Sequence, residues 1–241
     1  MSERAERLNA QQLSTPSLAE RTSQLILDAI VEGKIKAEES FPSQYQLTEW
    51  FGVSRTVIRE ATQILVSKGI LNVKHGKRIT IRPASHEQVT ESLGLAFRRG
   101  GVSVLDVLAL RKALEVESAG LAALHATDEN LAEMRGKLEE MERYLLEEKG
   151  YVQADVEFHE TVFTAAGQPA FELVLRSLTD YLMEIRKISF RGEQKTKQAA
   201  DAHRRIYEAI EKRDEEEARR AMRVHLEETE DNLRTSLADL T

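Results

Sequence analysis

The chain of 241 residues is 41% hydrophobic and 31% charged, which is typical of a globular protein with one large or two smaller domains. It has no cysteine, which excludes disulfides and thiolate metal ligands, and no run of about 18 apolar residues, so no membrane span is expected. The polar N-terminus lacks the apolar core of a signal peptide, and we therefore expect a cytoplasmic protein.

The net charge of −7 is unevenly distributed. Residues 1–82 hold 12 Lys and Arg against 9 Asp and Glu, whereas residues 83–241 hold 22 against 32. Within residues 54–82, seven basic residues accompany a single acid. A basic segment on an acidic protein is typical of a nucleic-acid-binding module, although charge alone fits a solvated surface equally well.

The predicted elements begin after a polar tail that covers residues 1–16. Ser17 and Glu20 match a capping box, and apolar residues at helical spacing follow as far as Gly33. A second helix is predicted to start after Ser43 and to end at Gly52.

Ser54 is expected to cap a third helix, which ends at Gly69. Two β-type runs follow, residues 70–74 and 78–82, and the glycine between them predicts a hairpin. The order of helix, helix, tight turn, helix and hairpin predicts a winged helix-turn-helix domain over residues 17–83.

After Pro83 the periodicity of apolar residues is purely helical. We therefore predict a mainly α protein in which residues 84–241 form an all-α bundle of about seven helices, large enough to enclose a cavity. The predicted helices span residues 86–99, 103–125, 128–148, 151–166, 169–191, 194–212 and 214–238.

The third helix has the properties of a DNA-recognition helix. The N-terminal end of such a helix enters the major groove, where arginine can contact guanine and hydroxyl groups can contact phosphates. The tip of the hairpin suits the DNA backbone or the adjacent minor groove. The residues expected at the DNA are Ser54, Arg55, Thr56 and Arg59 of the helix and His75, Gly76 and Lys77 of the hairpin tip.

Polar side chains interrupt the apolar faces of three helices in the C-terminal region. Asp155 and His159 lie one helical turn apart, and His203 and His225 each fall on an apolar stripe. A single histidine on such a stripe is usually a satisfied core residue, but buried polar groups need partners. Three imidazoles and one carboxylate suit Zn, the first choice here, or Ni, Mn or Fe. Spacing alone leaves the metal and core interpretations open.

The segment FPSQYQLTEWFGVSRTVIREATQILVSKGILNVKHGKRITI resembles the winged helix of the GntR family of bacterial transcription regulators. Its most specific part is PSxxxLTxxFGVSRTxxREA, and the remaining helices resemble the FadR-type ligand-binding domain of the same family. The resemblance covers residues 17–239. Such proteins commonly have Glu-Arg after Pro-Ser, where this chain has Gln44 and Tyr45, so Tyr45 takes the place of a residue that often contacts DNA.

The resemblance implies a homodimer that binds a pseudo-palindromic operator in double-stranded DNA and responds to a small carboxylate effector. In similar proteins an arginine in the motif LALRKALEVE pairs with the effector, which implies this role for Arg111; a salt bridge to Glu115 at i+4 is an equally good interpretation. One large group of FadR-type domains binds a metal through the pattern DxxxH…H…H. The matching residues are Asp155, His159, His203 and His225.

An enzyme is the alternative class, because a metal with open positions can activate water. Glu157 and Glu160 flank the Asp155 and His159 pair, but Glu160 is expected to point away from it, and no nucleophile accompanies the pair. We therefore expect a DNA-binding regulator rather than an enzyme. A regulator with a purely structural metal is the nearer alternative.

Overall fold

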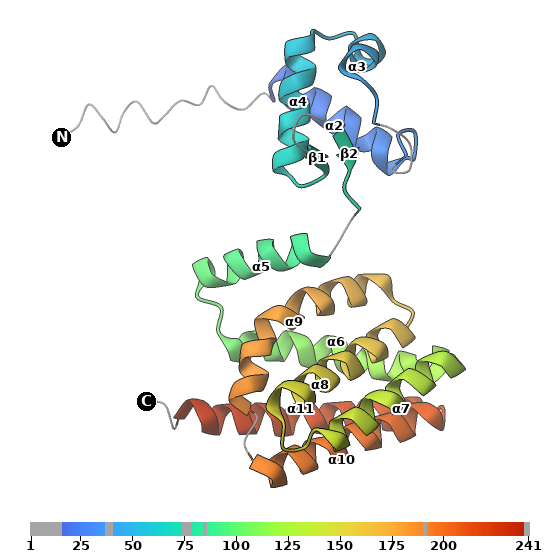
Figure 1. Cartoon of the computed structure of the whole chain (residues 1–241), viewed down its shortest axis with the longest axis vertical. Coiled ribbons are helices and arrows are strands. Elements are labelled where there is room, and N and C mark those ends of the chain that lie inside the picture. Colours follow the sequence, from blue (N-terminus) through green and yellow to red (C-terminus); the bar gives the residue numbers. More distant parts are fainter. Residues whose placement is uncertain (1–15, 37–40, 74–78, 84–85, 190–191, 239–241) are drawn as a thin grey trace, which may run out of the picture. The chain divides into compact units, whose positions relative to one another are not determined.

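The computed structural model describes residues 16–36, 41–73, 79–83, 86–189 and 192–238. Within these ranges it has ten helices and one two-stranded sheet, which confirms the predicted mainly α class (Figure 1). The chain divides into two compact units, residues 1–84 and 85–241. In the described ranges, no helix has both the length and the apolar character needed to cross a membrane.

The N-terminal unit has the element order of a winged helix-turn-helix. The two strands pair antiparallel, with Leu71 opposite Ile81. Helix α2 packs on α4, and Ile26, Ile58 and Leu65 are fully buried in the core between the elements. The elements are α2 (Leu18–Val31), α3 (Gln44–Phe51), α4 (Arg55–Ser67), β1 (Leu71–Val73) and β2 (Ile79–Ile81).

Local hydrogen bonds explain where these helices begin and end. Ser17 and Glu20 form the predicted capping box at α2, in which each side chain accepts a hydrogen bond from the other residue's backbone N–H. The Ser54 hydroxyl accepts a hydrogen bond of 3.3 Å from the N–H of Val57 and so caps α4. Gly52 ends α3 with a φ of +64°, a conformation that glycine adopts without the strain of a Cβ.

The C-terminal unit contains seven helices. Helix α6 lies along α11, α7 lies along α8, and α10 packs on both α7 and α11. Met134, Phe158, Ile206 and Met222 are fully buried in the core between them. The helices are α5 (His86–Gly100), α6 (Val104–His125), α7 (Asp128–Arg143), α8 (Glu148–Ala165), α9 (Pro169–Ser189), α10 (Gly192–Glu211) and α11 (Glu215–Ala238).

The connection between α7 and α8 differs from the prediction. The sequence predicts a helix over residues 128–148 and a break at Gly150, but α7 ends at Arg143 and Gly150 lies inside α8. A Cβ atom on Gly150 would lie 2.6 Å from Cγ of the Tyr144 ring. Glycine is therefore present because the ring packs against the helix backbone, and it does not act as a helix breaker.

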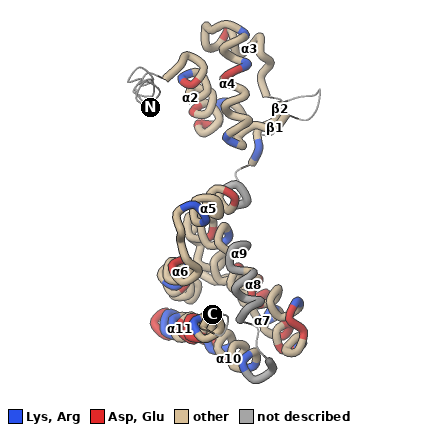
Figure 2. Tube along the Cα trace, turned by 90° about the vertical axis from the view of Figure 1, so that its left-hand side faces the viewer, with Lys and Arg blue, Asp and Glu red and all other residues tan. Residues whose placement is uncertain are grey.

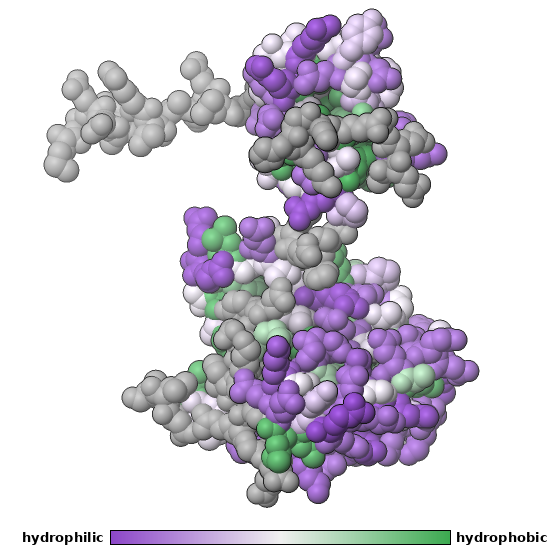
Figure 3. Space-filling view, viewed as in Figure 1, coloured by the Kyte–Doolittle hydropathy of each residue, from purple (hydrophilic) through white to green (hydrophobic). Residues whose placement is uncertain are grey.

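Surface charges of the C-terminal unit are largely paired. Acidic and basic residues both occur on α7 and α11 (Figure 2), and the face of this unit in Figure 3 is mainly hydrophilic. Arg219, for example, lies 3.0 Å from Glu117 and 2.7 Å from Glu215. Exposed pairs of this kind contribute little to stability, so the fold of this unit depends on what is buried.

The packing of Tyr144 predicts opposite effects for two glycine substitutions. Gly150→Ala should destabilise the protein by about 1–2 kcal/mol, because overpacking costs about 1–3 kcal/mol and better helix propensity returns at most about 1 kcal/mol. Gly136→Ala in α7 should stabilise it by about 0.5–1 kcal/mol, since a Cβ there meets nothing within 4 Å. Urea unfolding midpoints measure both; stabilisation by Gly150→Ala would show that the ring contact does not constrain this position.

Candidate functional site

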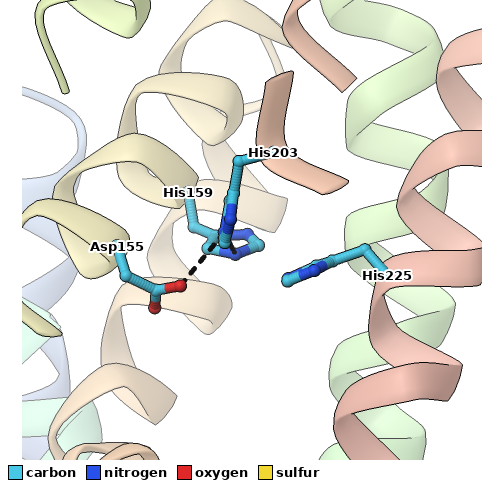
Figure 4. Close-up of side chains that lie close together, drawn as sticks. All are labelled: Asp155, His159, His203 and His225. Atoms are coloured by element: carbon cyan, nitrogen blue, oxygen red, sulfur yellow. Dashed lines mark hydrogen bonds and ion pairs between the residues drawn. The ribbon is translucent and has the colours of Figure 1, made fainter. Parts of the chain in front are cut away.

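Four polar side chains meet inside the C-terminal unit (Figure 4). Asp155 and His159 come from α8, His203 from α10 and His225 from α11. Each contributes one nitrogen or oxygen atom to a group whose members all lie within 4.8 Å of one another. The three histidines are buried and Asp155 is half-buried, so the structure brings all four predicted metal ligands together in a place that water reaches poorly.

Helix geometry and ring packing position the cluster. Asp155 and His159 are one turn apart on α8 and therefore point to the same side. Phe158, which is fully buried, meets the ring of His203 edge-on with ring centres 5.1 Å apart. The rings of His203 and His225 lie 4.3 Å apart. The imidazoles are thus held by their neighbours in the core.

The hydrogen-bond partners of two rings define where their lone pairs point. Nδ1 of His203 lies 2.7 Å from the backbone oxygen of Ala199, which can only accept, so Nδ1 carries the proton and Nε2 presents a lone pair. Nδ1 of His159 lies 2.6 Å from Oε2 of Glu115, within ion-pair distance although not aligned as in a regular hydrogen bond. The carboxylate favours the proton on Nδ1, which leaves Nε2 of His159 free as well.

These lone pairs converge. Nε2 of His203 lies 3.1 Å from Nε2 of His159 and 3.0 Å from Oδ1 of Asp155. Two lone pairs and a carboxylate oxygen repel one another at such distances unless a proton or a metal ion lies between them. Burial lowers the pKa of His159 to about 4, against the attraction of Glu115. Burial and the neighbouring histidines also lower the pKa of His225, so protons are poor occupants of these two rings near neutral pH.

The residues present fit a divalent metal. Three imidazole nitrogens and one carboxylate oxygen form a donor set that suits Zn, Ni, Mn or Fe. Neutral imidazole and ionised carboxylate are the forms that bind a cation. The convergence of these four ligand atoms is thus an observation of this structure that favours a metal over an ordinary polar core.

Arg111 and Glu115 are residues of α6, and they lie next to the cluster. Both side chains are buried, and Nε and Nη2 of Arg111 donate to the two oxygens of Glu115. Burial raises the pKa of Glu115, but the attraction of Arg111 and His159 outweighs it and lowers the pKa to about 2. The structure thus contains the i,i+4 salt bridge between Arg111 and Glu115, which was one of the two interpretations of Arg111. Among the described residues, no hydrogen bond uses its Nη1 atom.

A polar groove of about 420 Å³ lies between α10 and α11, and His225 is the member of the cluster that its lining includes. Lys195, Gln198, Arg205 and Glu228 also line it. In the described ranges, no hydrogen bond joins a ring nitrogen of His225 to another residue. The groove therefore adjoins the cluster at His225, which is itself buried.

Other polar residues that the sequence analysis considered lie outside the cluster. Glu157 lies 2.6 Å from Lys137, and Glu160 lies 2.5 Å from Arg176, so neither carboxylate faces the converging donors. His125 is exposed and lies 3.2 Å from the backbone oxygen of Ala166. A catalytic base beside the donors is therefore not found among these candidates.

The predicted DNA-contacting residues of α4 are all exposed at its N-terminal end. They are Ser54, Arg55, Thr56 and Arg59. Tyr45, at the start of α3, is 57% exposed, and a hydrogen bond to Glu49 raises its pKa. The predicted contacts at the hairpin tip, His75, Gly76 and Lys77, lie outside the described residues. An exposed helix end with two arginines is what reading a major groove requires.

Comparison with known proteins finds a matching family for each of the two units. Residues 18–81 match the model of the bacterial regulatory proteins of the gntR family, and residues 106–228 match the model of the FCD domain. The chain is a GntR-family transcription regulator of the FadR subfamily. Membership in this family confirms the predicted regulator and argues against the enzyme alternative.

Individual relatives agree with this assignment. The HTH-type transcriptional repressor NanR of Cronobacter sakazakii is 29% identical over 226 residues, which cover 91% of this chain and 86% of that protein. The NanR repressor of Salmonella newport has the same identity and coverage. The solved structure of Streptococcus agalactiae GntR superposes with a TM-score of 0.71 at 24% identity, covering 88% of this chain and 99% of that one, and so shares the fold.

Sequence reasoning did not find the contact between Glu115 and His159. It treated Glu115 only as a partner for Arg111, because helical spacing shows neighbours within one helix and not between two. A signal was nevertheless present: both charged residues fall on the face of α6 that carries buried Leu108 and Ala119. A charged pair on an apolar face indicates a further polar partner across the interface.

The geometry predicts one divalent ion per chain in protein purified without a histidine tag, measured by elemental analysis. The double mutant His203→Ala/His225→Ala should contain none, whereas His125→Ala should keep the ion, because His125 is outside the cluster. The ion should raise the melting temperature of the wild type, and its affinity should fall as pH drops and protons compete for the rings. Equal metal content in wild type and the double mutant would show that these residues are not the ligands.

Proposed function

We propose that this regulator binds its DNA operator as a homodimer in the cytoplasm, with an affinity set by a small carboxylate bound at a metal site formed by Asp155, His159, His203 and His225. The single observation that carries the proposal is the convergence of three imidazole nitrogens and one carboxylate oxygen within 4.8 Å in the unit that follows a DNA-recognition helix. Zinc is the first choice of ion for three nitrogens and one oxygen.

Two features favour an effector over a purely structural metal. When bound, a divalent ion supplies a positive charge that can accept oxygen ligands in addition to those of the protein. We take the groove that adjoins the cluster at His225 as the route for small molecules, since its lining of charged and amide side chains suits a polar solute. A structural site needs no such access, since its ligands come from the protein alone.

Arg111 is the residue that we assign to the effector's carboxylate. Its guanidinium is buried, and Nη1 has no hydrogen bond among the described residues, so a donor remains for an anion. A charge-assisted bond between arginine and carboxylate is short and strong compared with a neutral one. Glu115 holds the other side of the guanidinium and thereby orients it.

Coupling to DNA needs two arrangements of the dimer with different effector affinities. The two recognition helices of a dimer must match the spacing of the operator half-sites. A ligand that favours one arrangement of the helical domains changes that spacing and thus the affinity for DNA.

The exposed end of α4 predicts how arginine substitutions change DNA binding. Arg55→Ala or Arg59→Ala should weaken binding to the specific operator by about 1–3 kcal/mol and relax the base preference at one position of each half-site. Arg143→Ala in the C-terminal unit removes an exposed arginine without touching α4 and serves as the control. Fluorescence anisotropy on the operator found by unbiased DNA selection gives the affinities. A selection that returns no preferred sequence would contradict specific recognition.

The proposed coupling predicts reciprocal effects of acid and DNA. Acetate, lactate and malonate are titrated calorimetrically into metal-loaded and metal-free protein, with and without operator DNA. An acid that acts as effector should bind only the loaded protein and change DNA affinity roughly 5- to 150-fold, about 1–3 kcal/mol, and DNA should change acid affinity by the same factor. The acid should be recovered unchanged.

Two outcomes would separate the parts of this proposal. Tight binding of an acid to metal-free protein would remove the metal from effector recognition. A bound metal with no acid response, in protein that still binds its operator, would favour the alternative of a purely structural ion.

A further inference from the structure

Glu115 is a buried carboxylate that is not among the four proposed metal ligands. It lies on α6, its side chain is 1% exposed, and both of its oxygens accept hydrogen bonds from Arg111. Its Oε2 atom also lies 2.6 Å from Nδ1 of His159 on α8. One carboxylate therefore joins an arginine on its own helix to a metal-ligand candidate on another.

Stability alone does not account for this pair. Taking two charges out of water costs several kcal/mol per ion, and apolar residues of similar volume often serve a core equally well or better. The pair is nevertheless buried on the face of α6 that also carries buried Leu108 and Ala119. A role for the carboxylate at His159 explains why charge is kept here.

The geometry points to Glu115 as a positioning residue of the metal centre: by drawing the Nδ1 proton of His159 toward itself, it turns the Nε2 lone pair toward Asp155 and His203, and Arg111 anchors it for this task. Histidines that bind metals usually donate their other ring N–H to a carboxylate or a backbone oxygen. His203 does so with the backbone oxygen of Ala199, and Glu115 supplies the equivalent partner for His159. The assignment rests on the proposed metal site.

One consequence concerns Arg111. An anion that pairs with this guanidinium shares it with Glu115, and Glu115 in turn contacts His159. Glu115 therefore lies between the arginine assigned to the effector and the proposed metal ligand His159. Occupation of the effector site and affinity for the metal are connected through this single carboxylate.

The test uses two double variants that differ only in the acceptor offered to His159. Arg111→Met/Glu115→Gln keeps an amide oxygen that can accept from Nδ1, whereas Arg111→Met/Glu115→Leu removes the acceptor. Both remove the two buried charges together, so neither leaves an uncompensated charge in the core. Zinc affinity is measured for full-length protein by competition with a chromophoric chelator at constant pH.

We expect the Met/Leu variant to bind zinc roughly 10- to 100-fold more weakly than wild type, the usual effect of losing such a partner, and the Met/Gln variant to recover most of the loss. Glu117→Gln is the matched control. Glu117 is on the same helix and pairs with Arg219 on α11 at 3.0 Å, but it is not part of the cluster, so zinc affinity should stay within about twofold of wild type.

A second measurement reports the tautomer of the His159 ring. Long-range ¹H–¹⁵N spectra of metal-free protein show which nitrogen of each histidine carries the proton, and His159→Gln identifies the His159 signals. Wild type and the Met/Gln variant should show the Nδ1–H form at His159, and the Met/Leu variant should shift toward Nε2–H. A residue that merely fills space would not change this equilibrium.

Three outcomes would overturn the assignment. Equal zinc affinity in the Met/Leu variant and wild type, or equal losses in both double variants, would show that the acceptor does not matter. An Nε2–H form in metal-free wild type would show that Glu115 does not set the tautomer. Wild type that binds no zinc, nickel, manganese or iron would instead remove the proposed metal site on which the assignment rests.

Discussion

Polar groups buried away from water must find partners inside the protein, and in the C-terminal unit this requirement is met along one chain of contacts. The chain runs from Arg111 through Glu115 to His159 and on to His203, and it crosses from α6 through α8 to α10. Arg111 donates hydrogen bonds to Glu115, and Glu115 lies at ion-pair distance from His159. The last contact brings two lone pairs together beside Asp155, and it is there that a positive charge is needed.

The two units use charge in opposite ways. On α4 the arginines that we propose as DNA contacts are exposed at the helix end, where water hydrates them. In the helical unit the charges that matter are buried, and the many exposed pairs of α7 and α11 contribute little. A regulator needs both exposed and buried charges, because operator binding must be reversible whereas an effector site must be selective.

Local patterns of the sequence predicted local structure well. The capping box at Ser17, the cap at Ser54 and the left-handed turn at Gly52 each depend on a few consecutive residues, and all are found. The inward direction of the histidines followed from helical periodicity, but their convergence depended on resemblance to a family. Contacts between helices were missed: the ring of Tyr144 against Gly150 is a consequence of packing that no spacing along the chain reveals.

The proposed centre also joins parts of the chain that are distant in sequence, and this matters in a protein without cysteine. His159 and His203 are 44 residues apart, and His225 adds a third helix. An ion held by all three would tie α8, α10 and α11 together in the folded state and would stabilise that state because it binds the folded site and not the unfolded chain. Unlike a disulfide, this link would form in a reducing compartment and could be withdrawn by chelation. The persistence of the folded regulator, and not only its response to an effector, would then follow the supply of metal in the cell.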